Sequence, residues 1–376
     1  MFAQEAVAGQ HPQNLYEQLL TAARRQRRLL HVHWELTYRC NEHCTHCYLD
    51  VLRPGAVAPN ELSTVECLQV VDQLADLGVV NLTFSGGEIL VRRDFFVIAG
   101  YAHEKRFVLR LFTNGIGITP HVADQMAELH PYAVEISLYA IDAATHDAIT
   151  QVPGSFKRTV RALQLLHDRA VRTVVKTPLM HENVRQVHGL RELADELGAG
   201  FRTDLTITTK RDGTCGPLRH RLTDDDLLWV MRETLDSTHW PATLPPPDAP
   251  VCGVSQLALV IDPSGDVCPC AEIRTAAGNV RRQPVADIWR QSAVFTALNG
   301  VTRNDLPLCR ACSLAALCVR CHGVALNEEG DLRRPALTNC RTALARRQVL
   351  IEKGALAPGF PVPLHLLANR TAYAKR

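Results

Sequence analysis

The sequence predicts an α/β protein: a partial, TIM-like (β/α)6 barrel followed by a small cysteine-rich domain. Strand-like and helix-like segments alternate along the first 238 residues, which is typical of parallel βαβ units. A proline-rich stretch at 240–250 then interrupts the pattern, because proline cannot continue a helix. Beyond that stretch lie eight of the 13 cysteines. A chain of 376 residues is long enough for one large core and a small second domain.

Six strand-like segments, rich in apolar and β-branched residues, alternate with five helix-like segments. The strands are expected at 31–38, 79–84, 107–112, 133–138, 171–177 and 201–208. The helices are expected at 60–77, 94–104, 120–129, 155–169 and 183–197. Such connections give parallel strands joined by right-handed crossovers, with the helices covering a buried sheet.

Motifs that can carry chemistry follow the first five predicted strands. They are the cysteine loop 40–47, SGGE at 85–88, TNG at 113–115, SLY at 137–139 and KTPLM at 176–180. In (β/α) barrels the functional groups lie on the loops at the C-terminal ends of the strands. We therefore expect these motifs to share one edge of the sheet.

The cysteine loop, RCNEHCTHCY, contains Cys40, Cys44 and Cys47 in the spacing C-x3-C-x2-C. Iron–sulphur clusters are normally held by four thiolates. A loop that offers three therefore predicts a four-iron cluster with one iron open to another ligand. Taken alone, the same cysteines are also compatible with a zinc site, a redox site or buried apolar thiols.

The spacing and the SGGE motif one βα unit later resemble the signature of the radical S-adenosylmethionine (SAM) superfamily. The resemblance implies that the open iron chelates SAM. Electron transfer then splits SAM into methionine and a 5′-deoxyadenosyl radical, while the protein binds, orients and shields the cofactor.

The resemblance also implies which residues contact SAM. The methionyl amino group is assigned to Gly86, Gly87 and Glu88, and the adenosine and carboxylate parts are assigned to Thr113, Asn114 and Ser137. The residue before the third cysteine is usually aromatic in this family. Here it is His46, which we expect either to contact the adenine or to be a partly solvated loop histidine.

The cysteines beyond the proline-rich stretch are regularly spaced. They are Cys252, Cys268, Cys270, Cys309, Cys312, Cys318, Cys321 and Cys340. This pattern resembles the SPASM domain, which carries two auxiliary four-iron clusters. The family connectivity implies that one cluster is bound by Cys252, Cys270 and Cys321. It implies that the other is bound by Cys309, Cys312, Cys318 and Cys340.

Two departures from the family pattern concern the first auxiliary cluster. The last gap of the run C-x2-C-x5-C-x2-C is two residues where three is usual, and Cys268 is an additional cysteine beside Cys270. Cys268 is expected to be the fourth ligand of that cluster, with a spare thiol as the alternative. The alternative for the whole cysteine-rich segment is one or two zinc sites. Cys67 and Cys215 match no motif and are expected to be structural.

Composition excludes several classes of protein. A formal net charge of +2 argues against general nucleic-acid binding. The N-terminal residues contain no apolar h-region, and no run of about 18 apolar residues occurs. We therefore expect a cytoplasmic protein without an export signal or a membrane span, whose thiols are available for metal. The ARRQRR run at 23–28 is expected to be a solvated helix face, or alternatively a site for an acidic leader peptide.

The expected domain organisation has five parts. These are an N-terminal helical extension at 1–30, the partial barrel at 31–238, a linker at 239–250, the SPASM domain at 251–345 and a tail at 346–376.

The resemblance implies an enzyme that abstracts hydrogen from a ribosomally made precursor peptide and leaves it oxidatively modified or cross-linked. The expected partners are that peptide, a separate peptide-recognition protein, and an electron donor such as flavodoxin or ferredoxin. Tetrapyrrole side-chain modification in a haem d1 or alternative haem pathway, and sulfatase activation, share the same motifs. A non-catalytic metal-binding scaffold is the remote alternative. No catalytic acid or base is assigned, although Lys176 and Asp204 face the barrel mouth if the predicted register holds.

Overall fold

The computed structural model describes residues 15–244, 246–248, 250–363 and 366. The chain forms two compact units, each assembled from separate segments. One unit comprises 28–221 and 257–295, and the other comprises the described parts of 1–27, 222–256 and 296–376. The ends of the expected N-terminal extension and of the tail, 1–14, 364–365 and 367–376, lie outside the described residues.

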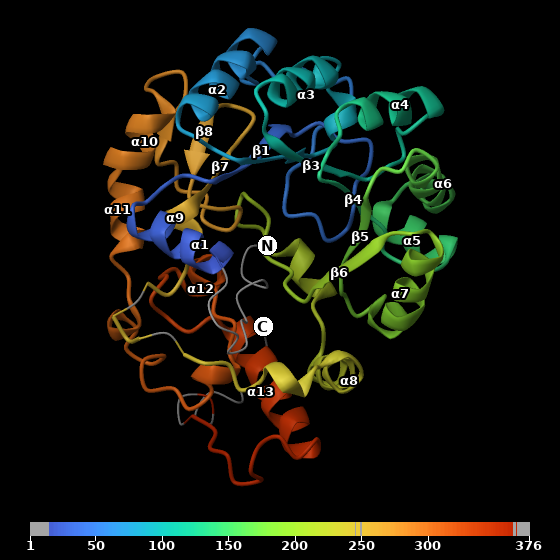
Figure 1. The fold of residues 1–376 in the computed structure, drawn as a ribbon. Helices are drawn as coiled ribbons and strands as arrows, with labels where there is room; N and C mark the ends of the chain where they lie inside the picture. The colour runs from blue at the N-terminus through green and yellow to red at the C-terminus, as the bar shows by residue number, and fades with distance from the viewer. Residues whose placement is uncertain (1–14, 245, 249, 364–365, 367–376) are drawn as a thin grey trace. The chain divides into compact units, whose positions relative to one another are not determined.

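The first unit, here called the barrel unit, is built on one open sheet of nine strands (Figure 1). The strand order is β6-β5-β4-β3-β2-β1-β7-β8-β9, and all neighbours from β6 to β7 are parallel. The strands are β1 His31–Thr37, β2 Asn81–Gly86, β3 Val108–Thr113, β4 Ala133–Ser137, β5 Thr173–Pro178, β6 Gly200–Asp204, β7 Ala258–Ile261, β8 Asp266–Cys268 and β9 Gly278–Asn279. The expected α/β partial barrel is confirmed.

Three strands were not predicted. β7 follows the proline-rich stretch and pairs in parallel with β1, with His31 opposite Ala258. β8 and β9 then continue the sheet in antiparallel fashion. The sequence signal was weak because these strands are only two to four residues long.

Helices cover one face of the sheet and form the outer layer of the barrel unit in Figure 1. They are α2 Thr64–Asp76, α3 Phe95–Glu104, α4 Pro120–Glu128, α5 Ala143–Thr150, α6 Ser155–His167, α7 Val187–Glu196 and α10 Val285–Gln291. α2 begins at residue 64 rather than 60 because Ser63 and Glu66 form a capping box. Short α5 was missed, although Asp142 caps it by accepting a hydrogen bond from Thr145 N.

Side chains alternate between the two faces of the sheet along each strand, and the two faces differ in polarity. Alternate residues such as Trp34, Leu82 and Phe84 belong to a large apolar core under the helices, where Phe84 also contacts the ring of Phe95 edge-on at 6.1 Å. Their neighbours along the strands point the opposite way and are mostly polar. The inner face therefore presents polar side chains instead of a sealed apolar core.

The second unit contains α1 Leu15–Arg25, α8 Asp224–Thr234, α12 His322–Glu329 and α13 Leu337–Glu352. Helices α9 Val254–Leu257 and α11 Ala293–Asn299 lie at the boundaries between the units. α8 and α13 are joined by a two-pronged ion pair between Arg232 and Glu352, at 2.8 and 2.9 Å. No helix in the described part of the chain is long and apolar enough to span a membrane.

Candidate active site

Two glycines at the end of β2 allow the backbone to touch the start of the cysteine loop. Gly87 N–H donates to the Thr37 carbonyl at 2.7 Å, and Glu88 N–H donates to the Arg39 carbonyl at 2.9 Å. A Cβ on Gly87 would overlap the Arg39 carbonyl oxygen and lie 2.8 Å from its carbon. Gly86 has a φ of +131°, and a Cβ there would overlap the Thr37 carbonyl oxygen. Only glycine fits at both positions.

Glu88 joins the glycine turn to the end of β3. Its carboxylate accepts hydrogen bonds from the Thr113 hydroxyl at 2.7 Å, the Asn114 N–H at 2.7 Å and the Leu90 N–H at 3.0 Å. The side chain is fully buried. Burial raises the pKa of Glu88 and outweighs these hydrogen bonds, which act to lower it. Glu88, which is a predicted SAM contact, therefore also holds the ends of β2 and β3 together.

The three cysteines of the loop lie close together on the same edge of the sheet. The Asn114 amide reaches back to the loop, donating to Asn41 Oδ1 at 2.7 Å and lying 4.0 Å from Cys40 Sγ. Cys44 Sγ lies 3.8 Å from the Tyr139 hydroxyl. Cys47 N–H donates to the Cys44 carbonyl at 3.0 Å, which closes a tight turn. The loop therefore meets the ends of β2, β3 and β4.

The chemistry of the loop fits an iron cluster. Burial raises the pKa of Cys40 to about 12, and it also raises the pKa values of Cys44 and Cys47. Nearby carboxylates or thiols raise all three pKa values further. For Cys44 these groups include both of the other thiols of the loop. Thiolates at these three positions would need positive charge nearby, which bound iron would supply.

His46 and Ser137 both adjoin Tyr139. The His46 ring meets the Tyr139 ring edge-on, with centroids 4.8 Å apart, and burial lowers the pKa of His46 to about 4. Ser137 ends β4 and hydrogen-bonds the Tyr139 hydroxyl. The His46 side chain is partly exposed, so the adenine contact and the partly solvated loop histidine both stay predictions. Tyr139 was missed as a separate site residue, although it belongs to the SLY motif.

A buried ion pair connects β1 to the segment after β8. Arg274 donates to both oxygens of Glu35 at 2.8 and 2.9 Å, and the hydroxyls of Tyr48 and Tyr38 donate to the same carboxylate at 2.8 and 3.0 Å. Burial acts to raise the pKa of Glu35, but Arg274 outweighs it and holds the pKa at about 2. Tyr48 directly follows Cys47, so this network also supports the cysteine loop.

Charged residues continue along the inner face toward β6. Lys176 Nζ lies 3.9 Å from the Glu135 carboxylate and 4.0 Å from the centre of the Phe112 ring. Burial lowers the pKa of Lys176 to about 8, although Glu135 and Asp204 act to raise it. The expected register holds, because Ser137 pairs with Lys176 and all of these residues point to the inner face.

Four of the downstream cysteines gather in the second unit. Cys312, Cys318 and Cys340 pack on the apolar cluster around Leu314 and Leu317. Burial raises the pKa of Cys340 above its ordinary value, and the nearby thiols Cys318, Cys309 and Cys312 raise it further.

The other predicted cluster ligands are divided between the units. Cys252 and Cys321 belong to the second unit, while Cys268 and Cys270 belong to the barrel unit. Cys268 is buried at the end of β8. Cys270 Sγ accepts a hydrogen bond from Ile273 N at 3.3 Å.

The two remaining cysteines lie apart from these groups. Cys67 is buried, and Arg92 Nη2 donates to its sulphur at 3.4 Å. Cys215 is exposed.

Comparison with known proteins identifies the two parts of the chain. The radical SAM superfamily model matches residues 34–194, and an iron-sulfur cluster-binding domain, SPASM, matches 252–313. Mycofactocin maturase MftC of Mycobacterium tuberculosis is 33% identical over 282 residues, which cover 70% of this chain and 71% of the relative. AdoMet-dependent heme synthase of Methanosarcina barkeri is 27% identical over 332 residues, covering 79% and 92%. Streptococcus suis SuiB, solved bound to its precursor peptide SuiA, shares the fold with a TM-score of 0.64 at 15% identity, covering 88% of this chain and 82% of that chain.

The glycine turn gives a direct test of the loop geometry. Gly87→Ala would push the Arg39 carbonyl and the cysteine loop away, so we expect about four fewer irons per chain after reconstitution and loss of SAM binding. The matched control is Gly100→Ala in α3, where a Cβ meets nothing within 4 Å. Wild-type iron content in Gly87→Ala, measured by elemental analysis, would contradict the close approach.

The buried ion pair predicts a loss of stability that does not depend on pH near neutrality. Glu35→Gln leaves Arg274 without its counter-charge, which should cost about 3–5 kcal/mol of unfolding free energy. The folded pKa of about 2 lies below the ordinary value of 4.5, so the pair contributes fully above pH 4.5 and is lost only as the pH falls toward 2. Urea unfolding at pH 6 and pH 8 should show the same deficit, whereas exposed Glu128→Gln should show none. A deficit that changes between these pH values would refute the assignment.

Proposed function

The chain belongs to the radical SAM superfamily, and from that membership we propose that its substrate is a ribosomally synthesised precursor peptide, which it modifies or cross-links oxidatively. It is an enzyme that uses a four-iron cluster and SAM, and its SPASM domain binds auxiliary iron–sulphur clusters. The single observation that carries the substrate proposal is its 33% identity to a mycofactocin maturase over 70% of the chain.

In this proposal Cys40, Cys44 and Cys47 hold the SAM-binding cluster. The support is their convergence on the sheet edge where the ends of β2, β3 and β4 meet. When bound, this cluster supplies the electron that cleaves SAM to methionine and a 5′-deoxyadenosyl radical. The cysteine loop would fix the position of that electron transfer at this edge of the sheet.

The turn Gly86–Glu88 and the ends of β3 and β4 orient SAM in this proposal. The backbone of the glycine turn provides close approach, while Thr113, Asn114 and Ser137 supply polar groups at the adjoining strand ends. His46 and Tyr139 form an aromatic corner beside the cysteines, which suits contact with an adenine.

The inner face of the barrel unit would hold the peptide. Lys176, Glu135 and Asp204 offer both signs of charge beside the ring of Phe112. A peptide segment presents amides and side chains that such groups can bind and orient. We propose Lys176 as a substrate-positioning residue. Its charge is lost as the pH rises through about 8.

The auxiliary cluster in the second unit would be held by Cys309, Cys312, Cys318 and Cys340. Cys312, Cys318 and Cys340 pack on one apolar cluster, and Cys309 lies close enough to raise the pKa of Cys340, which supports this assignment. For the other cluster we keep the set implied by the family pattern, Cys252, Cys270 and Cys321 with Cys268 as the fourth ligand. We also propose a flavodoxin or ferredoxin as electron donor, and a separate peptide-recognition protein as a partner.

Tetrapyrrole modification is the second candidate function. It is favoured by 27% identity to an AdoMet-dependent heme synthase, which extends over 92% of that relative. A tetrapyrrole substrate presents several carboxylates, and Lys176 could bind one of them. The two functions predict different substrates for the same site.

Substrate-dependent SAM cleavage distinguishes the two functions. Iron-loaded, reduced protein should form 5′-deoxyadenosine faster when given short peptides encoded beside its gene. One of these peptides should lose the mass of two hydrogen atoms per cross-link. Cys44→Ala should abolish both products, while Cys215→Ala, which alters an exposed thiol outside the motifs, should retain them. Turnover of didecarboxysirohaem, with every peptide unchanged, would show that the peptide proposal is wrong.

A further inference from the structure

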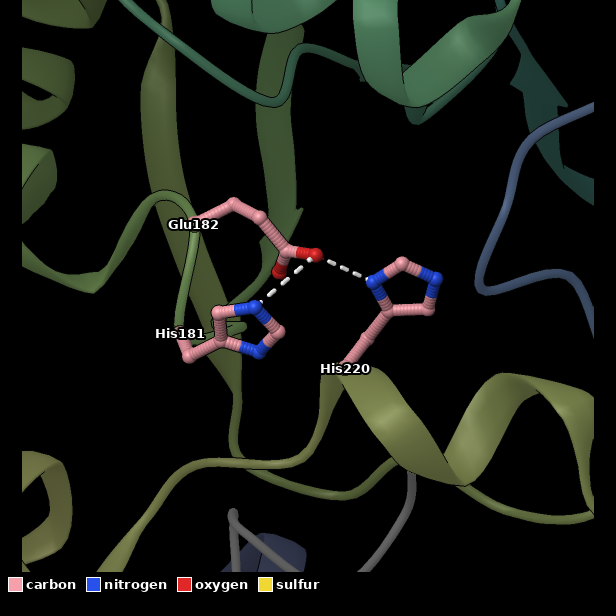
Figure 2. A group of neighbouring side chains, drawn as sticks. All are labelled: His181, Glu182 and His220. Atoms are coloured by element: carbon pink, nitrogen blue, oxygen red, sulfur yellow. Dashed lines mark hydrogen bonds and ion pairs between the residues drawn. The ribbon is translucent and has the colours of Figure 1, made fainter.

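A second group of potential metal ligands lies in the barrel unit, and none of its members is a cysteine. His181 and Glu182 follow β5, and His220 ends the short helix η3 (Gly216–His220). One ligand atom from each of the three residues lies within 4.8 Å of the other two, and Figure 2 shows the three side chains turned toward one another. The group could not be recognised in the sequence, because 38 residues separate His220 from Glu182.

Both imidazole rings place a nitrogen next to the same carboxylate oxygen of Glu182. Glu182 Oε1 lies 3.3 Å from His181 Nε2 and hydrogen-bonds His220 Nδ1. The two rings are nearly parallel, at 10°, with centroids 6.0 Å apart. Ligand atoms bound to one zinc ion at about 2.0–2.2 Å are separated from each other by roughly 3.2–3.6 Å. The three side chains therefore need only a small adjustment to surround one ion.

The backbone around the group is held in place before any ion binds. Asn183, which is fully buried, accepts from Met180 N–H at 2.7 Å and donates to the carbonyls of Tyr139 and Pro178 at 2.9 and 3.1 Å. His181 N–H donates to the His220 carbonyl at 3.3 Å, which joins the two segments directly. Such support is what a metal site requires of its surroundings.

The group is open on one side. The side chain of His220 is only 8% exposed, whereas those of His181 and Glu182 are 44% and 28% exposed. Two histidines and one carboxylate are a ligand set that zinc uses in sites with an exchangeable fourth position. Closed structural sites supply four protein ligands instead.

We propose that His181, Glu182 and His220 bind one divalent transition-metal ion, with Zn²⁺ as the best match to the ligand set, and leave a coordination position open to water or another exchangeable donor. The ligand atoms are His181 Nε2, a Glu182 carboxylate oxygen and His220 Nδ1. Ion binding displaces the protons that these nitrogens share with the carboxylate. None of its three ligands is a cysteine, and the proposal does not depend on the identity of the substrate.

Arg219 sets a condition on this binding. Its Nε lies 3.1 Å from His220 Nε2. Coordination through Nδ1 leaves the ring proton on Nε2, which then cannot accept a hydrogen bond from arginine, so Arg219 must turn aside. Arg219→Gln removes the opposing charge and offers an amide oxygen to that proton. We expect it to tighten zinc binding by about threefold to tenfold.

The test uses the iron-loaded protein and Zn²⁺ alone as the probe. After addition of zinc and removal of the excess, we expect about one zinc per chain with nitrogen and oxygen ligands at about 2.0–2.1 Å by X-ray absorption, and not sulphur at 2.3 Å. His181→Ala, Glu182→Gln and His220→Ala should each lose this zinc and keep the wild-type iron content. His121→Ala, which alters an exposed histidine on α4, should keep both metals.

Three results would overturn the proposal. They are no zinc in the wild type, zinc bound through sulphur, and zinc retained in all three ligand variants. If the ligand variants fail to keep their iron, Arg219→Gln decides instead, because it leaves all three ligands in place. Zinc affinity equal to or weaker than that of the wild type in this variant would refute the site, and tighter binding would support it.

Discussion

The active end of the barrel depends on one backbone contact. Gly87 and Glu88 hydrogen-bond the carbonyls of Thr37 and Arg39, and a side chain on either Gly86 or Gly87 would prevent the approach. This contact fastens the end of β2 to the root of the cysteine loop. The Glu88 carboxylate also accepts hydrogen bonds from Thr113 and Asn114, so the end of β3 is held in the same arrangement. The glycines thus shape the protein before they meet any ligand.

Burying charged side chains on the inner face of the barrel unit costs considerable free energy, and ion pairs offset that cost. Glu35 is fully buried and would be strongly destabilising without the two-pronged contact from Arg274. Lys176 is balanced by Glu135 in the same way. An apolar inner face would be more stable but would offer a substrate no directional contacts. The polar face is therefore more readily explained by function than by folding.

The parts that could be predicted from the sequence depend on local patterns. The strand-helix alternation predicted six of the nine strands, and the motifs after the strands predicted that the cysteine loop would meet the glycine turn. The register that turns Lys176 inward followed from the same alternation. Contacts between distant residues could not be predicted: Arg274 reaches Glu35 across 239 positions, and His220 meets Glu182 only because two loops converge. Short strands such as β9, with two residues, carry too few side chains to show a period.

The proposed chemistry depends above all on Cys40, Cys44 and Cys47 together holding one four-iron cluster at the sheet edge. The most direct measurement is iron per chain after anaerobic reconstitution, comparing the wild type with a variant in which all three are alanine. We expect about 12 irons in the wild type and about 8 in the variant, since one four-iron cluster is lost and two remain. Equal iron in the two proteins, or zinc in place of iron in the wild type, would contradict it.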